Sequence, residues 1–195
     1  MKKIVLIIMF LFIFSSFSFS ADDQEESKKG ILRELGVYGG YAKGHLDRQG
    51  PYHVAQMGLR FGFDMNPLLA KIHLKPPIGE FDFVIEPFIN PIIDPRSNVE
   101  LGAALMFKYM LPLSKRFSIY AEFGAAPSYY TLHTQEQSTQ FNFIDQAGGG
   151  FYVFLKDGLA LNAGYRRRHM SNASIKRPNS GINTDSYLLG LSYFK

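Results

Sequence analysis

The chain contains no cysteine, so no disulfide bond can stabilise its fold. Its five histidines stand at 45, 53, 73, 133 and 169, and no dense cluster of His, Asp and Glu accompanies them. Because structural zinc is held by close sets of Cys and His, no zinc site is recognisable. The sequence therefore implies neither a metal nor an organic cofactor.

A large net charge and a long apolar segment beyond the N-terminus are also missing. The formal charge of +4 falls to +2 when Lys2 and Lys3 are removed, which argues against nucleic acid as a partner. No later segment is apolar for long enough to form a membrane-spanning helix.

The N-terminus has the pattern of a secretory signal peptide. Lys2 and Lys3 precede an unbroken apolar run over 4–14, and small residues follow, so cleavage is expected near Ser20 or Ala21. The alternative, an uncleaved anchor, is weaker because the run is short for a membrane span. The chain then divides into a signal peptide (1–20), a flexible lead-in (21–30) and a folded domain (31–195).

The folded domain alternates apolar and polar residues in stretches of roughly ten, separated by turn residues. This pattern predicts eight strands, at Leu32–Lys43, His53–Met65, Gly79–Pro91, Val99–Leu111, Arg116–Tyr129, Gln140–Leu155, Leu159–Ser171 and Asn183–Phe194.

Two architectures show such alternation. A soluble barrel or sandwich buries the apolar face, whereas an outer-membrane barrel turns it to lipid. The apolar faces here are large and aromatic, and the polar faces carry small residues with charges of both signs, which can pair inside a narrow lumen. The chain also ends in TDSYLLGLSYFK, an alternating strand with aromatic last residues. We therefore predict an all-β fold, an eight-stranded antiparallel transmembrane β-barrel in the bacterial outer membrane.

Connection lengths fit a barrel with both ends in the periplasm. LPLSKR and LKDG are short, and the longer connections GHLDRQGPY, NPIIDPRSN, YYTLHTQEQSTQ and SNASIKRPNSGI are then external. The exception, NPLLAKIHLKPPIG, is a long periplasmic connection that predicts a strand extension or a short helix. Because side chains fill an eight-stranded barrel, a wide solute pore is not expected.

His169 and Ser171 stand two residues apart in the seventh predicted strand, so they share a face. That face also carries Leu161 and Tyr165, which places the pair outward, near the external edge of the membrane. If Ser171 faces Asn183 in the last strand, then His169 faces Asp185.

A slip of the register by two residues instead places His169 opposite Asn183. Either register supplies a hydroxyl, an imidazole and a third polar group, the arrangement of a catalytic triad. The structural alternative is that these are ordinary interfacial polar residues. Arg167 is likewise either an interfacial anchor or a ligand for a phosphorylated lipid headgroup.

The segment RHMSNASIKRPNSGIN resembles the C-terminal signature of the lipid A 3-O-deacylase family, also called acyloxyacyl hydrolases. That signature reads His-x-Ser-Asn-Ala, a few residues, Pro-Asn-x-Gly-Ile, and then the third catalytic residue. The segment FNFIDQAGGGFYVFL resembles the family's preceding strand. The matching positions are His169, Ser171, Asn172, Ala173, Pro178, Asn179, Gly181 and Ile182.

The resemblance implies an outer-membrane esterase that removes a 3-hydroxyacyl chain from lipid A of lipopolysaccharide in the outer leaflet. It implies Ser171 as nucleophile, His169 as general base and Asn172 as oxyanion donor, although strand parity sends Asn172 inward. The best-known members have Glu at the third catalytic position, where this chain has Asn183. Asn183 and Asp185 both remain candidates for that role.

Two other functions stay open at this stage. A non-catalytic structural or adhesive barrel would work through its external loops, and a lipid-binding or transport barrel would need an accessible lumen. The sequence leaves open which acyl chain and sugar position are cut, whether activity is latent in the membrane, and whether the protein forms a homodimer.

Overall fold

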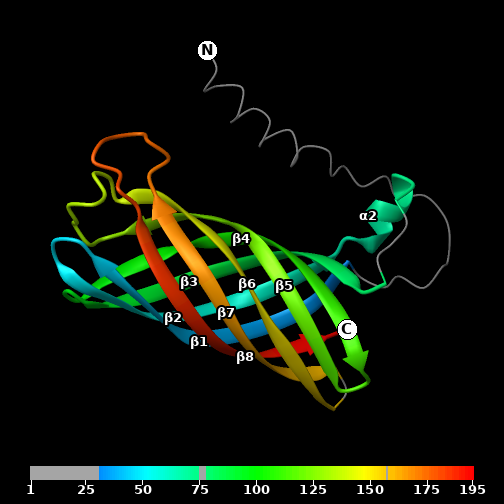
Figure 1. Cartoon of the computed structure of the whole chain (residues 1–195). Helices are drawn as coiled ribbons and strands as arrows, with labels where there is room; N and C mark the ends of the chain where they lie inside the picture. The colour runs from blue at the N-terminus through cyan, green and yellow to red at the C-terminus, as the bar shows by residue number, and fades with distance from the viewer. Residues whose placement is uncertain (1–30, 75–77, 157) are drawn as a thin grey trace. The chain divides into compact units, whose positions relative to one another are not determined.

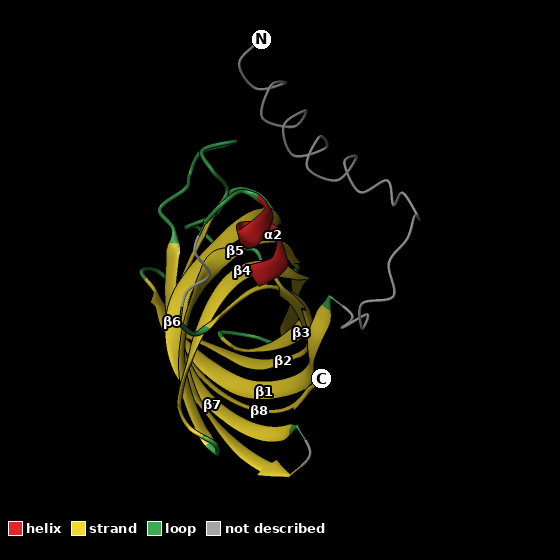
Figure 2. Cartoon of the chain, turned by 90° about the vertical axis from the view of Figure 1, so that its right-hand side faces the viewer, coloured by secondary structure: helices red, strands yellow, loops and turns green. Residues whose placement is uncertain are grey.

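The computed structural model describes residues 31–74, 78–156 and 158–195, and they form a closed barrel of eight antiparallel strands (Figures 1 and 2). The predicted signal peptide and lead-in lie outside the described residues. The strands are β1 (Leu32–Leu46), β2 (Gly50–Asp64), β3 (Glu80–Asp94), β4 (Asn98–Ser114), β5 (Phe117–Tyr130), β6 (Phe141–Lys156), β7 (Leu159–Ser171) and β8 (Ile182–Phe194).

Each strand pairs with its neighbour in the chain, and β8 pairs with β1 to close the barrel. The strands are 13 to 17 residues long, which exceeds the 9–11 residues that a tilted strand needs to cross a bilayer. The prediction of an all-β, eight-stranded antiparallel barrel is confirmed.

The connections gather at two ends (Figure 1). We call one of them the loop end, with turns 47–49 and 95–97 and loops 131–140 and 172–181. The other, the turn end, has the short turn 115–116, the connection between β6 and β7, and the connection between β2 and β3. That segment contains a short helix, α2 (Asn66–Lys71, red in Figure 2), one of the two predicted alternatives.

Two predicted long loops, 44–52 and 90–98, are instead three-residue turns. The strands extend into these segments because the alternation of inward and outward side chains continues there. Leu46, Tyr52 and Ile92 all point inward and are at most 2% exposed. Burying these side chains stabilises the extended pairing, so the loop end has only two long loops.

The outer surface of the barrel is apolar. Leu189 is 70% exposed and Phe123 is 59% exposed, and similar side chains lie on every strand. A charged interior with an apolar exterior is the arrangement of a transmembrane barrel. Among the described residues, no helix has the length and apolar character to cross a bilayer.

The middle of the lumen contains a network of buried ion pairs. Arg60 lies 2.5 Å from Glu122, 3.1 Å from Glu86 and 3.2 Å from Glu34. Arg166 bonds Glu86 and Glu122 at 2.6 Å each. The buried charges of the lumen are four cations and five anions among the described residues, namely Arg60, Lys108, Arg166, Arg168, Glu34, Asp82, Glu86, Glu100 and Glu122. The less buried Arg33 pairs with Asp82 and also lies 3.3 Å from Glu80 and 3.9 Å from Asp64. Each buried charge has at least one partner of opposite sign, so the buried groups compensate one another.

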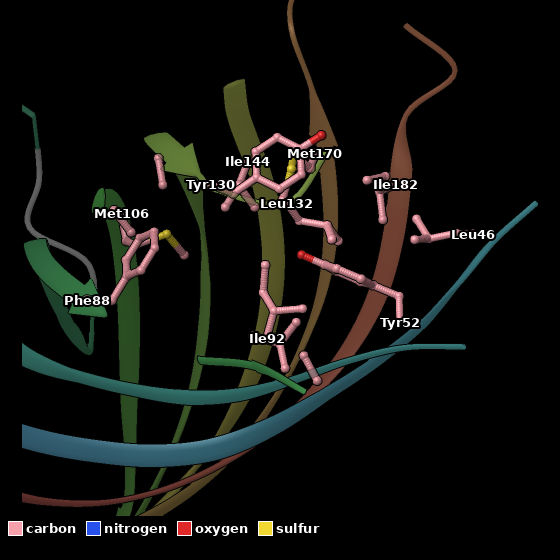
Figure 3. Close-up of a cluster of buried hydrophobic side chains, with 14 of the residues drawn as sticks. Leu46, Tyr52, Phe88, Ile92, Met106, Tyr130, Leu132, Ile144, Met170 and Ile182 are labelled. Carbon is pink, nitrogen blue, oxygen red and sulfur yellow. The ribbon is translucent and has the colours of Figure 1, made fainter. Parts of the chain in front are cut away.

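Apolar side chains fill the lumen on both sides of this network. Toward the loop end they form one cluster, shown in Figure 3, that includes Tyr52, Ile92, Tyr130 and Ile144. Toward the turn end Tyr120 and Tyr152 pack together. A cavity between Gln56, Asn90, Gln146 and Arg166 measures about 10 Å³, which is room for about one water molecule.

Candidate active site

The β7–β8 hairpin carries His169 and Ser171 on its outward face, next to the loop end. In its register His169 lies opposite Asn183, and Arg167 lies opposite Asp185. The structure therefore has the second of the two registers considered from the sequence. His169 is exposed, and its Nδ1 lies 2.8 Å from Asn183 Oδ1.

This hydrogen bond fixes which ring nitrogen carries the proton when the imidazole is neutral. An amide oxygen only accepts hydrogen bonds, so Nδ1 of His169 must carry the proton that it donates to Asn183 Oδ1. In the neutral imidazole with this tautomer, the other nitrogen, Nε2, is unprotonated and can accept a proton. A neutral His169 held by Asn183 thus has the form that a general base needs.

Asp185 is engaged elsewhere. Its two oxygens accept hydrogen bonds from Tyr165 Oη at 2.5 Å and from Arg167 Nη1 at 2.7 Å. Both partners lie further from the loop end than His169 does, so they hold the Asp185 carboxylate away from the imidazole. The structure brings Asn183, and not Asp185, to the imidazole.

Arg167, the sequence candidate for the lipid headgroup, lies on the outer surface with its side chain 54% exposed. Its ion pair with Asp185 uses Nη1 alone. A guanidinium has five N–H donors, so the remaining donors of Arg167 are available to a further anionic group.

Ser171 is the last residue of β7 and is partly exposed. In the β6–β7 ladder it lies opposite Phe143, whose ring packs edge-on against Phe141 at 5.3 Å between centroids. No hydrogen bond joins Ser171 to His169 in the structure. Catalytic hydrogen bonds are often long before substrate binds, so the two side chains remain candidates for one site.

Asn172 is fully buried, because the chain turns inward where β7 ends. Its Nδ2 donates to Lys176 O at 2.8 Å and to Ser138 Oγ at 3.3 Å, and its backbone N–H donates to Asn179 Oδ1 at 2.9 Å. The geometry thus places the Asn172 amide in the loop and not beside Ser171.

The loop 172–181 is docked on the loop 131–140. Ser138 N–H donates to Pro178 O at 3.1 Å, and Ser180 N–H donates to Glu136 O at 2.9 Å. At the end of this loop, Gly181 has a φ of +79° and packs on the ring of His169. The Pro, Asn and Gly residues of the sequence motif therefore shape the loop beside the imidazole.

Sequence analysis missed Asp145, which lies on β6 directly opposite His169. A signal was available: Asp145 is a carboxylate on the outward face of a strand whose outward residues are otherwise apolar or glycine, namely Phe141, Phe143, Ala147, Gly149, Phe151, Val153 and Leu155. Choosing it required the β6–β7 register, which the sequence does not supply. No group of three His, Asp or Glu residues within the described ranges is placed to hold a metal ion.

A closed barrel with a charged lumen and an apolar exterior defines a transmembrane barrel, and it carries Ser171, His169 and Asn183 near one rim. The model of one family, lipid A 3-O-deacylase (PagL), matches residues 55–192. The chain belongs to this family, whose activity is deacylation of lipid A, and it is an outer-membrane protein. A comparison with curated proteins found no match.

Two solved structures share the fold. The outer membrane enzyme PagL has a TM-score of 0.62 at 19% identity, covering 80% of this chain and 97% of its own. Neisserial surface protein A (NspA) has a TM-score of 0.56 at 12% identity, covering 83% of this chain and 96% of its own. At these identities the likeness supports the fold, and the family match carries the functional class.

Proposed function

We propose that the protein is a serine esterase that removes a 3-O-linked hydroxyacyl chain from lipid A, at a site on the external side of the outer membrane. The observation that carries the proposal is the 2.8 Å contact between His169 Nδ1 and Asn183 Oδ1, two residues along β7 from Ser171. It leaves Nε2 of His169 free to take a proton on the surface where a lipid would lie.

The reaction follows from these roles. Ser171 Oγ attacks the ester carbonyl carbon while His169 Nε2 takes the hydroxyl proton. The tetrahedral intermediate then collapses, the sugar oxygen leaves with the proton from His169, and an acyl-Ser171 ester remains. Water attacks this ester with His169 again as base, which releases the hydroxy fatty acid and restores Ser171.

A surface site suits a lipid substrate. The outward faces of β6 and β7 are apolar below the site, with Phe151 and Leu161 exposed at 40% and 48%. An acyl chain can lie against this wall while its ester reaches Ser171, without entering the filled lumen. Arg167 is then placed to contact an anionic headgroup through the guanidinium donors that Asp185 leaves unused.

The oxyanion role of Asn172 stays a prediction. For its side chain to donate to the tetrahedral oxygen, the amide would have to release Lys176 O or Ser138 Oγ, each of which it now contacts.

The test is mass spectrometry of lipid A from cells that lack deacylation and express either the wild type or Ser171→Ala. We expect loss of one hydroxyacyl mass with the wild type only. Ser180→Ala is the matched control, because Ser180 is an exposed serine of the neighbouring loop. Equal lipid A from the wild type and Ser171→Ala, with both proteins folded and inserted, would contradict the proposal and favour a non-catalytic barrel.

A further inference from the structure

We propose that Asp145 acts through His169 and supplies, from β6, the negative charge that Asn183 cannot supply from β8. The inference rests on the proposed function and deepens it. Its basis is the placement of His169 between an amide on one neighbouring strand and a carboxylate on the other.

The strand register places both neighbours. His169 lies opposite Asn183 in the β7–β8 ladder and opposite Asp145 in the β6–β7 ladder. Directly opposed residues on one face have Cβ atoms about 4.5–5.5 Å apart. The carboxylate of Asp145 and the imidazole therefore extend from adjacent positions on one face of the sheet.

The carboxylate of Asp145 is also free to act on the imidazole. It is exposed, and no hydrogen bond or ion pair joins it to another residue of the described ranges. The other charged groups near His169 on this face are Arg167 on its own strand and Asp185 on β8, which form an ion pair at 2.7 Å, and Lys43 on β1, which lies opposite Asp185. Asp145 is thus the carboxylate directly opposite the ring that no ion pair among the described residues engages.

The proposed reaction gives this charge a role. When His169 takes the proton of Ser171 it becomes an imidazolium, and its bonded partner Asn183 is neutral. A carboxylate about 5 Å away stabilises that cation by a factor of about four even in a water-like medium, and by more where water is excluded. The substrate's acyl chain would exclude water from this surface.

Asp145 acts through charge and not through a hydrogen bond. Nδ1 of His169 is already bonded to Asn183, and Nε2 must remain free for the proton of Ser171. The predicted effect is therefore on the protonation equilibrium of His169 and on kcat, with little effect on how the ring is oriented.

The experiment measures kcat, KM and the pH profile of kcat/KM with purified lipopolysaccharide in detergent micelles. We expect Asp145→Asn to lower kcat about fourfold or more and to move the acidic midpoint of kcat/KM down by about half a pH unit, because removing a negative charge makes His169 a weaker base. Asp145→Glu, which keeps the charge, should retain most of the activity.

A second substitution separates charge compensation from other roles. In the Asp145→Asn background, Asn183→Asp restores a carboxylate on the opposite side of His169, and we expect kcat and the pH midpoint to return toward wild type. Asp94→Asn is the control, since Asp94 is an outward carboxylate near the loop end that contacts His53 at 2.8 Å, on β3 and away from β7. It should leave both quantities unchanged.

The outcomes are distinct. A wild-type pH midpoint in Asp145→Asn, or a change confined to KM that Asn183→Asp does not repair, would overturn the role of Asp145 and leave the esterase intact. Full activity in Ser171→Ala would instead overturn the proposed function. The unboiled electrophoretic mobility of each variant establishes that its barrel is folded.

Discussion

Gly181 lies so close to the imidazole of His169 that a β-carbon at position 181 would come within 2.4 Å of Cε1. Glycine is therefore required here for two reasons: a side chain would collide with the imidazole, and a φ of +79° is a conformation that other residues rarely adopt. The end of loop 172–181 therefore fixes where the ring can lie.

Replacing Gly181 by alanine should displace the imidazole and lower kcat by about tenfold to a hundredfold, since small misplacements of a catalytic group are costly. Gly50→Ala is the matched control. Gly50 has a φ of +81°, but a β-carbon there would meet nothing within 4 Å. Deacylation rates of the two variants separate the contact with His169 from backbone strain; equal losses in both would contradict the argument.

Asn183 and Asp185 should differ in their effect on activity. Asn183→Ala removes the acceptor for the Nδ1 proton of His169 and frees the ring, so kcat/KM should fall roughly a hundredfold or more. Asp185→Asn weakens an exposed ion pair with Arg167 and should change kcat/KM by about threefold or less. Kinetics on purified variants test this order, and a reversed order would make Asp185 the partner of His169.

Lys108 should be essential to stability. Its side chain is fully buried and lies 2.5 Å from Glu34 and 3.0 Å from Asp82. Lys108→Met leaves both carboxylates undercompensated and should lower the free energy of unfolding by about 3–5 kcal/mol. Urea unfolding in lipid vesicles measures it, with Lys43→Met, an exposed lysine of β1, as the control. Equal unfolding midpoints for the two variants would show that the lumen network does not act as described.

Asn172→Ala should loosen loop 172–181, because the amide of Asn172 bonds Lys176 O from inside the loop. Trypsin cleavage after Lys176, followed by mass spectrometry, should become several times faster than in the wild type. Ser180→Ala should cleave at the wild-type rate. If Asn172→Ala loses activity while cleavage is unchanged, the residue has a chemical role, as an oxyanion donor would.

Much of the fold could be predicted from the sequence because alternation determines both faces of a barrel strand. In β2, for example, Leu59 and Phe61 face outward, and Arg60 between them faces the lumen. The strand ends were harder to place. Turn-like residues such as Gly44 and Pro51 suggested a loop, whereas pairing and the burial of Leu46 and Tyr52 extend both strands to a short turn.

The site could be predicted in part. The spacing of His169 and Ser171 determines their common face, but the partner of His169 depends on the β7–β8 register. That register is set by the loop between the strands, which contains Ala173 and Ser174 at φ of 50° and 61° and docks on a loop distant in sequence. Local patterns do not encode such long-range contacts, so Asn183 and Asp185 could not be separated and Asp145 was missed.

The filled lumen has a consequence for the membrane that holds the protein. Apolar clusters close the barrel on both sides of the ion-pair network, and the cavity beside Arg166 measures about 10 Å³. Such an interior gives ions, nutrients and antibiotics no route through the wall. A cell can therefore carry many copies of this protein without weakening its permeability barrier, and any product made on the outer surface diffuses sideways into the leaflet.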